Sequence, residues 1–219
     1  MEHSVSGVGV LDKALWVIEA LEGAPRSLGE LVEVTGLTRA TAHRLATALE
    51  AHGLVRRDDE GRFALGLRLI ALGRASADAH PLGELARPAL AELRELTGES
   101  VQLYVRDGES RVCVASLESP HGLRTIVPEG AVLTMEVGSA AKLLRGDGDA
   151  LERGWAESVA EREAGVASVS APVTDPEGAV VAVVSVSGPI ERTTRQPGRR
   201  YADAVVGAAR RLEADALPA

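Results

Sequence analysis

The sequence contains very little cysteine and very few aromatic residues. A single cysteine, Cys113, occurs among 219 residues, together with one Phe, two Trp and two Tyr. One cysteine excludes an internal disulfide and is typical of a protein from a reducing compartment. Because aromatic rings are so scarce, we expect small aliphatic side chains to fill most of the core. Cys113 itself lies in the apolar run 112–114, so we expect a buried and unreactive thiol.

Long apolar runs and an excess of positive charge are missing too. No run of 18 apolar residues and no signal peptide is found, which predicts a cytoplasmic protein that makes no contact with membranes. The net charge is −8 at pH 7. Residues 1–79 hold nine Lys or Arg against eleven Asp or Glu, and therefore lack the basic character of many nucleic-acid-binding domains.

Patterns of common catalytic and cofactor sites are also missing. The chain has no HExxH, CxxC, Walker loop or GxSxG. The segment 7–9 (GVG) is no dinucleotide fingerprint, because no strand precedes it. His43 and His52 are not at metal-ligand spacing, and we expect His121 to lie in a surface loop. We therefore predict that the protein is not an enzyme and has no metal site and no cofactor.

Residues 27–66 are the most informative segment, because they predict a winged helix-turn-helix. Ser27 and Glu30 form a capping box for a first short helix, and Gly36 ends that helix. Thr38 caps a second helix, which Gly53 ends. A hairpin follows, with strands at 54–57 and 62–65 around the turn 58–61. This order of elements would place the second helix in the major groove of DNA.

The second helix of this segment is predicted to have a small apolar inner face and a polar outer face. The inner face is predicted to contain Thr41, Leu45, Ala48 and Leu49, and the outer face Arg39, Ala40, His43, Arg44 and Thr47. Residues 38–57 contain four arginines and one glutamate, a local charge of +3. Arginine reaches phosphates or guanine edges, and short side chains allow close approach. The predicted DNA contacts are Arg39, Thr41, His43, Arg44 and Thr47 in the groove, with Arg56, Arg57 and Arg62 on phosphate, although Thr41 points partly inward.

Such a modest positive charge predicts weak, salt-sensitive binding by one domain, so we expect two or more copies on one DNA. The alternatives are a winged helix used only for protein contacts, or a scaffold protein, which would leave the polar outer face unexplained. A first helix at 8–22 is predicted to complete the domain. We expect its buried residues to be Val10, Leu11, Ala14, Leu15, Ile18 and Leu21. A connecting helix at 66–79, broken at His80-Pro81, is predicted to pair protomers on a pseudo-palindromic operator.

The second half of the chain predicts an α+β domain in which an antiparallel sheet is flanked by helices. We expect helices at 83–97, 138–144, 149–163 and 200–217, the first with Leu85, Ala89, Leu93 and Leu96 turned inward. We expect strands at 100–106, 111–117, 166–174 and 180–187, and an extended segment at 123–135. The predicted boundaries are 1–66 for the winged helix-turn-helix, 67–80 for the linker helix and 81–219 for the second domain.

Several short strings resemble the IclR family of bacterial transcriptional regulators along essentially the whole chain. They are 11–15 (LDKAL), 41–45 (TAHRL), 171–173 (APV) and 185–189 (SVSGP). In detail the chain looks closest to the NdgR-like branch, the actinobacterial regulators of amino-acid metabolism. The resemblance implies a DNA-binding winged helix, a GAF-like effector-binding domain and a homodimer or tetramer.

The resemblance also implies an effector pocket. It would use backbone amides at Ala140 and Ala141 beside Ser139, polar groups at Ser168, Ser185 and Ser187, and apolar walls at Leu133 and Met135. Ser158 and Ser168 replace an aspartate and a cysteine of other members, so pocket specificity does not transfer. Helix-start amides favour a carboxylate, and serines suit a small polar metabolite such as an amino acid or keto acid. No Lys or Arg is predicted to point in, which argues against a polyanion. Without the resemblance, Ser185 and Ser187 would be read as ordinary strand residues bonded to nearby backbone.

Overall fold

The computed structural model describes residues 7–79 and 81–216. The chain divides into two compact units, Met1–Ala79 and His80–Ala219, and each is described by itself. None of the described helices is both long enough and apolar enough to cross a membrane. The predicted break at His80 lies outside the described residues, as do residues 1–6 and 217–219.

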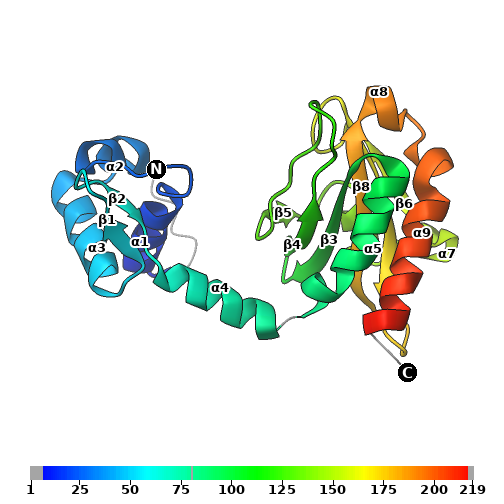
Figure 1. Cartoon of the computed structure of the whole chain (residues 1–219), viewed down its shortest axis with the longest axis horizontal. Helices are drawn as coiled ribbons and strands as arrows, with labels where there is room; N and C mark the ends of the chain where they lie inside the picture. Colours follow the sequence, from blue (N-terminus) through cyan, green and yellow to red (C-terminus); the bar gives the residue numbers. More distant parts are fainter. Residues whose placement is uncertain (1–6, 80, 217–219) are drawn as a thin grey trace. The chain divides into compact units, whose positions relative to one another are not determined.

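The first unit is a winged helix-turn-helix, as predicted (Figure 1). It contains α1 (Gly9–Glu19), α2 (Leu28–Thr35) and α3 (Arg39–Ala51), followed by the wing strands β1 (Val55–Arg57) and β2 (Phe63–Leu65). The two strands pair antiparallel, with Arg57 opposite Phe63. The three helices and the wing enclose one small core, in which the side chains of Val17, Leu31, Val55 and Phe63 are almost completely buried.

The ends of α2 and α3 follow the predicted local signals. The Ser27 hydroxyl accepts a hydrogen bond from the Glu30 backbone amide at 3.3 Å, and the Ser27 amide donates to the Glu30 carboxylate at 2.7 Å. Gly36 ends α2 with a φ of 68°, a conformation that costs glycine little. The Thr38 side chain caps α3 by accepting from the Thr41 amide at 3.3 Å.

Two predicted inner faces of this unit need correction. On α1, Val10, Leu11 and Leu15 are exposed, while Val17 and Leu21 are buried. Both sides of α1 are apolar, so the packing against α2 and α3 chooses the buried side, not the apolar spacing. On α3, Leu45 and Leu49 are buried as predicted, but Ala48 is exposed and Ala42 and Ala46 take the inner positions.

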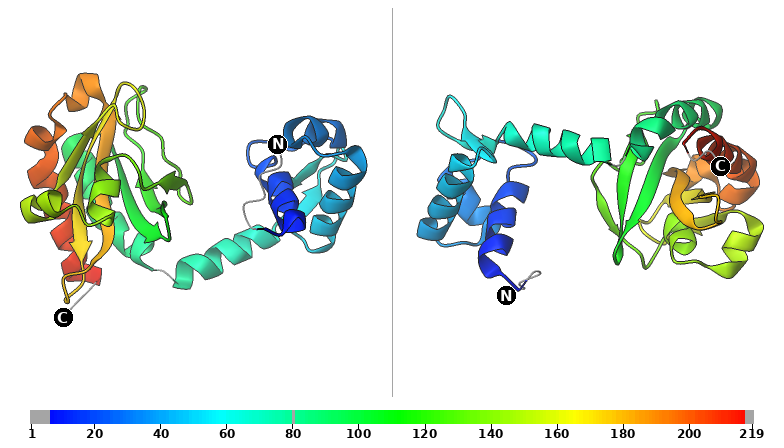
Figure 2. Two further views of the ribbon diagram at one scale, coloured as in Figure 1. Left: turned by 180° about the vertical axis from the view of Figure 1, so that it is seen from behind. Right: turned by 90° about the horizontal axis from the view of Figure 1, so that it is seen from below.

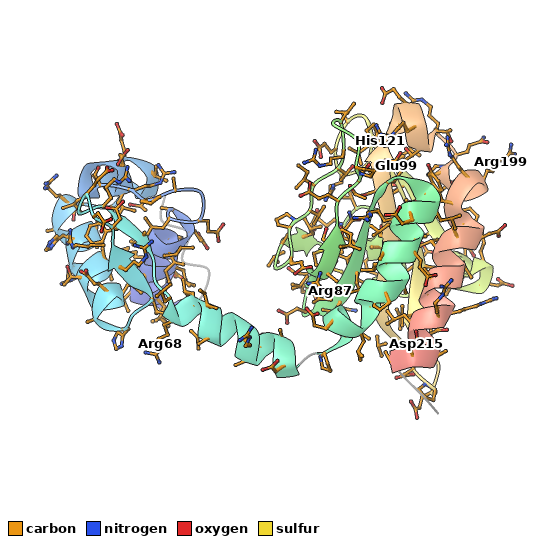
Figure 3. The ribbon with its side chains drawn as sticks, viewed as in Figure 1. Arg68, Arg87, Glu99, His121, Arg199 and Asp215 are labelled. Carbon is orange, nitrogen blue, oxygen red and sulfur yellow. The ribbon has the colours of Figure 1, made fainter. Side chains whose placement is uncertain are left out.

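The connecting helix α4 (Arg68–Ala79) leaves the wing directly. Arg68, labelled in Figure 3, donates from Nη1 to the His52 carbonyl at 3.1 Å and so ties the start of α4 to the end of α3. None of the described side chains of α4 is buried.

The second unit is built on a six-stranded antiparallel sheet in the order β5-β4-β3-β8-β7-β6. Its strands are β3 (Ser100–Asp107), β4 (Ser110–Leu117), β5 (Val132–Thr134), β6 (Ala156–Val159), β7 (Val166–Thr174) and β8 (Val180–Pro189). The long helices α5 (Leu82–Thr97) and α9 (Pro197–Ala216) pack together on one face (Figures 1 and 2). The short helices α6 (Ser139–Leu144) and α7 (Gly148–Arg153) belong to the other face, and α8 (Ile190–Thr193) follows β8.

The main errors of prediction in this unit lie between the regular elements. The predicted helix 149–163 stops at Arg153, because Gly154 takes a φ of 79°, and β6 follows instead. Of the extended segment 123–135, only Val132–Thr134 pairs with β4. On α5, Leu85 and Leu96 are exposed, and the core side is formed by Ala86, Ala89, Leu90 and Leu93. The short helix α8 was not predicted.

The two faces of the sheet differ in chemistry, and this difference positions the site. Toward α5 and α9 the strands present aliphatic side chains such as Val101, Leu103 and Val184. The alternate positions of β7 and β8 are occupied by serines, and Gln102 on β3 is paired with Ser185. Because successive strand residues point to opposite faces, these polar side chains gather on the α6 side of the sheet.

Candidate DNA-binding face and effector cavity

The outer face of α3 is exposed as predicted. Arg39, His43, Arg44 and Thr47 all have exposed side chains. Within the described part of the chain, neither Arg39 nor Arg44 makes a hydrogen bond or an ion pair through its side chain. Thr41 differs, because it is half-buried and its hydroxyl accepts a hydrogen bond from Thr38 at 2.9 Å. The two arginines therefore remain available for an external anion.

The three wing arginines are in different states. Arg56 is exposed and makes no ion pair with a described residue. Arg57 lies over the Phe63 ring at 4.2 Å and within 3.5 Å of the Glu50 carboxylate. Arg62 is bound by Asp58 at 2.8 Å and by Glu60 at 3.2 Å, and its hydrogen bond to Asp58 is the main reason that its pKa is raised. Of the three, Arg56 is the one whose charge is not already compensated.

The second unit contains a small cavity between α6 and the serine-bearing face of the sheet, with a volume of about 30 Å³. Six of the predicted effector residues line it: Ser139, Ala140, Ser158, Ser168, Ser185 and Ser187. Ala141 is buried in α6, while Met135 and Leu133 pack in the apolar cluster beside the cavity. The remaining lining residues, which were not predicted, are Tyr104, Arg111, Gly138, Arg162, Glu163 and Val166.

The serine hydroxyls form a connected chain. Ser139 Oγ lies 2.7 Å from both Ser168 Oγ and Ser170 Oγ, and Ser170 donates to Ser185 at 2.9 Å. Ser187 donates to the Gln102 side-chain oxygen at 3.1 Å. These contacts bring together residues of α6, β3, β7 and β8, so the hydroxyls are bound to one another and not to backbone as ordinary strand residues would be.

The expectation that no basic residue enters the pocket is wrong. Arg111 and Arg162 both line the cavity, and Arg111 is only 3% exposed. Strand alternation contained a signal for Arg111, because it lies two residues before Cys113 and therefore shares the side that was predicted to be buried. Arg162 had no such signal, because it lies in a turn after β6 that the sequence had predicted as helix.

Burial determines the electrostatics around Arg111. Its pKa is lowered, first by burial and then by the charges of Arg162 and Arg145, with Tyr104 opposing. The guanidinium fits beside Gly138, where a β-carbon would lie only 3.2 Å from Arg111 Nη2. Gly138 has a φ of 102°, and its amide donates to the Glu161 carboxylate at 3.1 Å.

Cys113 is buried, as predicted, and its Sγ contacts the Ala115 carbonyl at 3.4 Å. Burial raises the pKa of this thiol to about 12, so almost none of it is the reactive thiolate at neutral pH. Among the described residues, no group of three or more His, Cys, Asp or Glu side chains is arranged to hold a metal ion.

Comparison with known families accounts for both units. The profile of the IclR helix-turn-helix domain matches residues 10–59. The profile described as "Bacterial transcriptional regulator IclR C-terminal" matches residues 74–146 and 148–214. Among curated relatives, the glycerol operon regulatory protein of Streptomyces griseus is 29% identical over 216 residues, which cover 83% of this chain and 85% of the relative.

Solved structures give the same result for the fold. An IclR-family transcriptional regulator from a Rhodococcus species is 29% identical, covers 100% of this chain and 98% of its own, and has a TM-score of 0.58. An IclR homologue from Microbacterium hydrocarbonoxydans, crystallised with 4-hydroxybenzoate, is 17% identical with a TM-score of 0.77, over 94% of this chain and 98% of its own. The second likeness concerns the fold alone, and its ligand belongs to that protein.

Proposed function

Because the chain belongs to the IclR family of bacterial DNA-binding transcriptional regulators, we propose that α3 reads operator bases in the major groove. Family membership places the chain among regulators and not among enzymes. The observation that carries the proposal is the exposed α3 face, on which Arg39 and Arg44 have no carboxylate partner among the residues that the structure describes. His43 and Thr47 complete this face with shorter side chains that allow close approach.

The wing supplies backbone contacts in this proposal. Arg56 binds phosphate directly, because no described residue forms an ion pair with it. Arg57 can bind phosphate only if it leaves Glu50. Arg62 can do so only if it leaves Asp58 and Glu60. The exchange weakens their net contribution, since each lost ion pair has to be replaced by a new one.

We further propose that the regulator acts as a homodimer or tetramer on a pseudo-palindromic operator. The helix α4 has twelve residues, a length that is marginal for an isolated helix in water, and none of its described side chains is buried. Leu67, which precedes it, and Ile70 within it are 71% and 66% exposed. A second copy that packs against these side chains explains how the helix persists, and it joins two DNA-reading heads.

The cavity is proposed to bind a small polar metabolite of the amino-acid or keto-acid class, which changes the DNA affinity. The connected serines support this assignment, because hydroxyls can both donate to and accept from such a ligand. The likeness of sequence strings to the NdgR-like branch supports a further proposal, that the target genes belong to amino-acid metabolism. Relatives in the family regulate other operons, such as the glycerol operon of Streptomyces griseus.

The first test is binding of the full chain to its own upstream DNA at about 150 mM salt, a concentration that suppresses weak non-specific contacts. If Arg44 reads a base, Arg44→Ala weakens specific binding by about 1–3 kcal/mol and relaxes the sequence preference at one position. If Arg44 contacts phosphate alone, Arg44→Ala instead lowers the slope of log affinity against log salt concentration by about one unit and leaves the sequence preference unchanged. Arg199→Ala, at an exposed arginine on α9, is the matched control and should bind like the parent.

Two outcomes would contradict the proposal. Equal, feeble binding of parent and Arg44→Ala to every fragment would overturn base reading by α3 and favour a protein-contact role for the winged helix. Full, selective binding by Arg44→Ala together with Arg39→Ala would assign recognition to another surface.

A further inference from the structure

The cavity of the second unit contains a buried cation without a counter-ion. Arg111 is 3% exposed, and no carboxylate among the described residues forms an ion pair with it. Its hydrogen bond runs from Nη1 to the Thr134 carbonyl, while the buried Nε has no partner. Burying a charge without a partner costs free energy. A buried arginine without a partner therefore indicates a place where a ligand supplies the opposite charge.

A second cation lines the same cavity. Arg162 is half-buried and likewise has no carboxylate partner in the described chain. Arg145 adds a third positive charge nearby, since it contributes to lowering the pKa of Arg111, and its Nη1 donates to the Glu136 carbonyl at 2.7 Å. The one carboxylate in the lining is that of Glu163, which is exposed. The Glu161 carboxylate accepts from the Gly138 amide beside the cavity, and its charge is compensated by Lys142 at 2.6 Å. Positive charge therefore exceeds negative charge at the cavity.

The hydroxyl chain also directs protons toward the cavity. Ser170 uses its proton to donate to Ser185. Ser139 therefore has to donate in its hydrogen bond with Ser170, and Ser168 has to donate in its hydrogen bond with Ser139. Each hydroxyl has one proton, so within these linked serines the Ser185 proton is left without an acceptor among the described residues. Ser185 lines the cavity, and aligned hydroxyls strengthen the donor at the end of their chain.

The residue bonded to Ser187 adds a further unused donor. Gln102 is completely buried and its Nε2 has no hydrogen-bond partner, while its Oε1 accepts from Ser187. The unsatisfied groups at this site are therefore donors: Arg111 Nε–H, Gln102 Nε2–H and the Ser185 hydroxyl. A ligand that satisfies them presents acceptor oxygens.

We propose that this site binds a small organic dianion without an ammonium group: Arg111 and Ser185 bind one anionic group inside the cavity, whose volume of about 30 Å³ has room for one such group, and the half-buried Arg162 binds the other group at the cavity edge. The inference rests on the proposed function and narrows its ligand class, because it excludes amino acids. An ammonium would face two arginines and surplus donors, and the one carboxylate in the lining is solvated. Two anionic groups instead compensate both cations. The second anionic group is a carboxylate or a phosphate ester, both of which present acceptor oxygens to a guanidinium.

The test compares ligands that differ in one group, by calorimetry on the full chain without DNA. The pairs are 2-oxoglutarate with glutamate, succinate with aspartate, and phosphoglycolate with glycolate. The ligand with two anionic groups and no ammonium should bind at least about 10-fold more tightly than its partner in at least one pair. Binding of the dicarboxylates alone, or of phosphoglycolate alone, identifies the second anionic group.

Two variants connect the binding to the named arginines. Arg111→Met keeps an unbranched side chain at this buried position without the charge, and it should weaken binding of the best dianion by about 30-fold or more. Arg162 lies in a half-exposed turn, so Arg162→Gln should fold like the parent. It should weaken binding of succinate more than that of butyrate, the monoacid of the same chain length. Arg106→Gln, opposite Arg111 on the same hairpin but half-exposed, is the matched control and should bind like the parent.

The proposal is overturned if no dianion of the panel binds at millimolar concentration. It is also overturned if an amino acid binds as tightly as its keto or deamino counterpart, or if Arg162→Gln binds the dianions unchanged. Because binding is measured without DNA, these outcomes are separate from a failure of operator recognition, which the Arg44→Ala experiment detects by itself.

Discussion

Glu99, labelled in Figure 3, is only 2% exposed. Among the described carboxylates of the second unit that form ion pairs, it is the most deeply buried. Arg192 binds it through Nε and Nη2 at 2.7 and 2.8 Å, the two-point geometry that makes such pairs strong. The backbone has adapted to the pair, because a β-carbon at Gly188 would lie 2.3 Å from Glu99 Oε2. A single side chain thus couples β3, β8 and α8.

Arg192→Ala should destabilise the second unit by about 3 kcal/mol, because it leaves the Glu99 charge buried and unpaired. Urea unfolding followed by the emission of Trp155 measures this, in a Trp16→Phe background that silences the first unit. Arg195→Ala, an exposed neighbour, should change stability by less than about 0.5 kcal/mol. Equal stability of the two variants would contradict the burial argument. Glu99→Gln added to Arg192→Ala should recover part of the loss, because it removes the orphaned charge.

At the scale of elements, α2 depends on its capping box. Hydrogen bonds with Ser27, first to its side chain and then to its backbone, hold the pKa of Glu30 below its usual value. A carboxyl whose pKa is lower in the folded state stabilises the fold above its unfolded pKa of about 4.5, and that contribution is lost as pH falls through the folded pKa. The start of the DNA-reading motif is therefore sensitive to acid.

Ser27→Ala should destabilise the first unit by about 1 kcal/mol, the usual cost of losing a capping hydroxyl. Trp16 emission in a Trp155→Phe background reports this unit. A second comparison is between Glu30→Gln and the parent. The parent should have the higher free energy of unfolding near neutral pH, and this difference should disappear as the pH is lowered below the folded pKa of Glu30. A difference that stays constant across this range would mean that the carboxylate does not act through its charge. Glu33→Gln, an exposed carboxyl on the same helix, is the control.

For the whole molecule, the negative net charge and the local positive charge of the α3 and wing segment act against each other. The chain is at −8, so long-range repulsion from DNA opposes the proposed contacts of the arginines on the α3 face. We therefore expect one head to bind weakly and two joined heads to have a higher effective affinity without any new contact. The exposed apolar side chains of α4 and of α1 are the surfaces available for this joining.

Ile70→Glu should reduce association of the chain and, as a consequence, weaken binding to a two-half-site operator by at least about 10-fold. Binding to a single half-site should change little, because Ile70 lies outside the α3 face. Sedimentation at several micromolar concentrations measures the association, and fluorescence anisotropy measures both DNA affinities. The substitution Ala75→Glu, at an exposed position on a different side of the same helix, should leave association as in the parent. A parent chain that sediments as a monomer and still binds operator tightly would rule out this mechanism.

Local signals were read correctly from the sequence because the groups that interact are close together along the chain. The caps at Ser27, Gly36 and Thr38 involve partners within four residues. Most strands of the second unit were predicted for the same reason, since alternation and turn residues are local. The prediction failed after Gly154, where a glycine with positive φ redirects the chain into β6 in spite of a helical composition.

The sequence by itself determined the winged helix-turn-helix, the polar outer face of α3 and most of the serines of the cavity. Only the tertiary structure decided which apolar side of α1 is buried, because Val10 and Leu15 are as apolar as Val17 and Leu21. It also decided that Arg111 and Arg162 meet at one cavity. Such a meeting depends on strand pairing between segments far apart in the chain, and no local pattern of residues encodes that pairing.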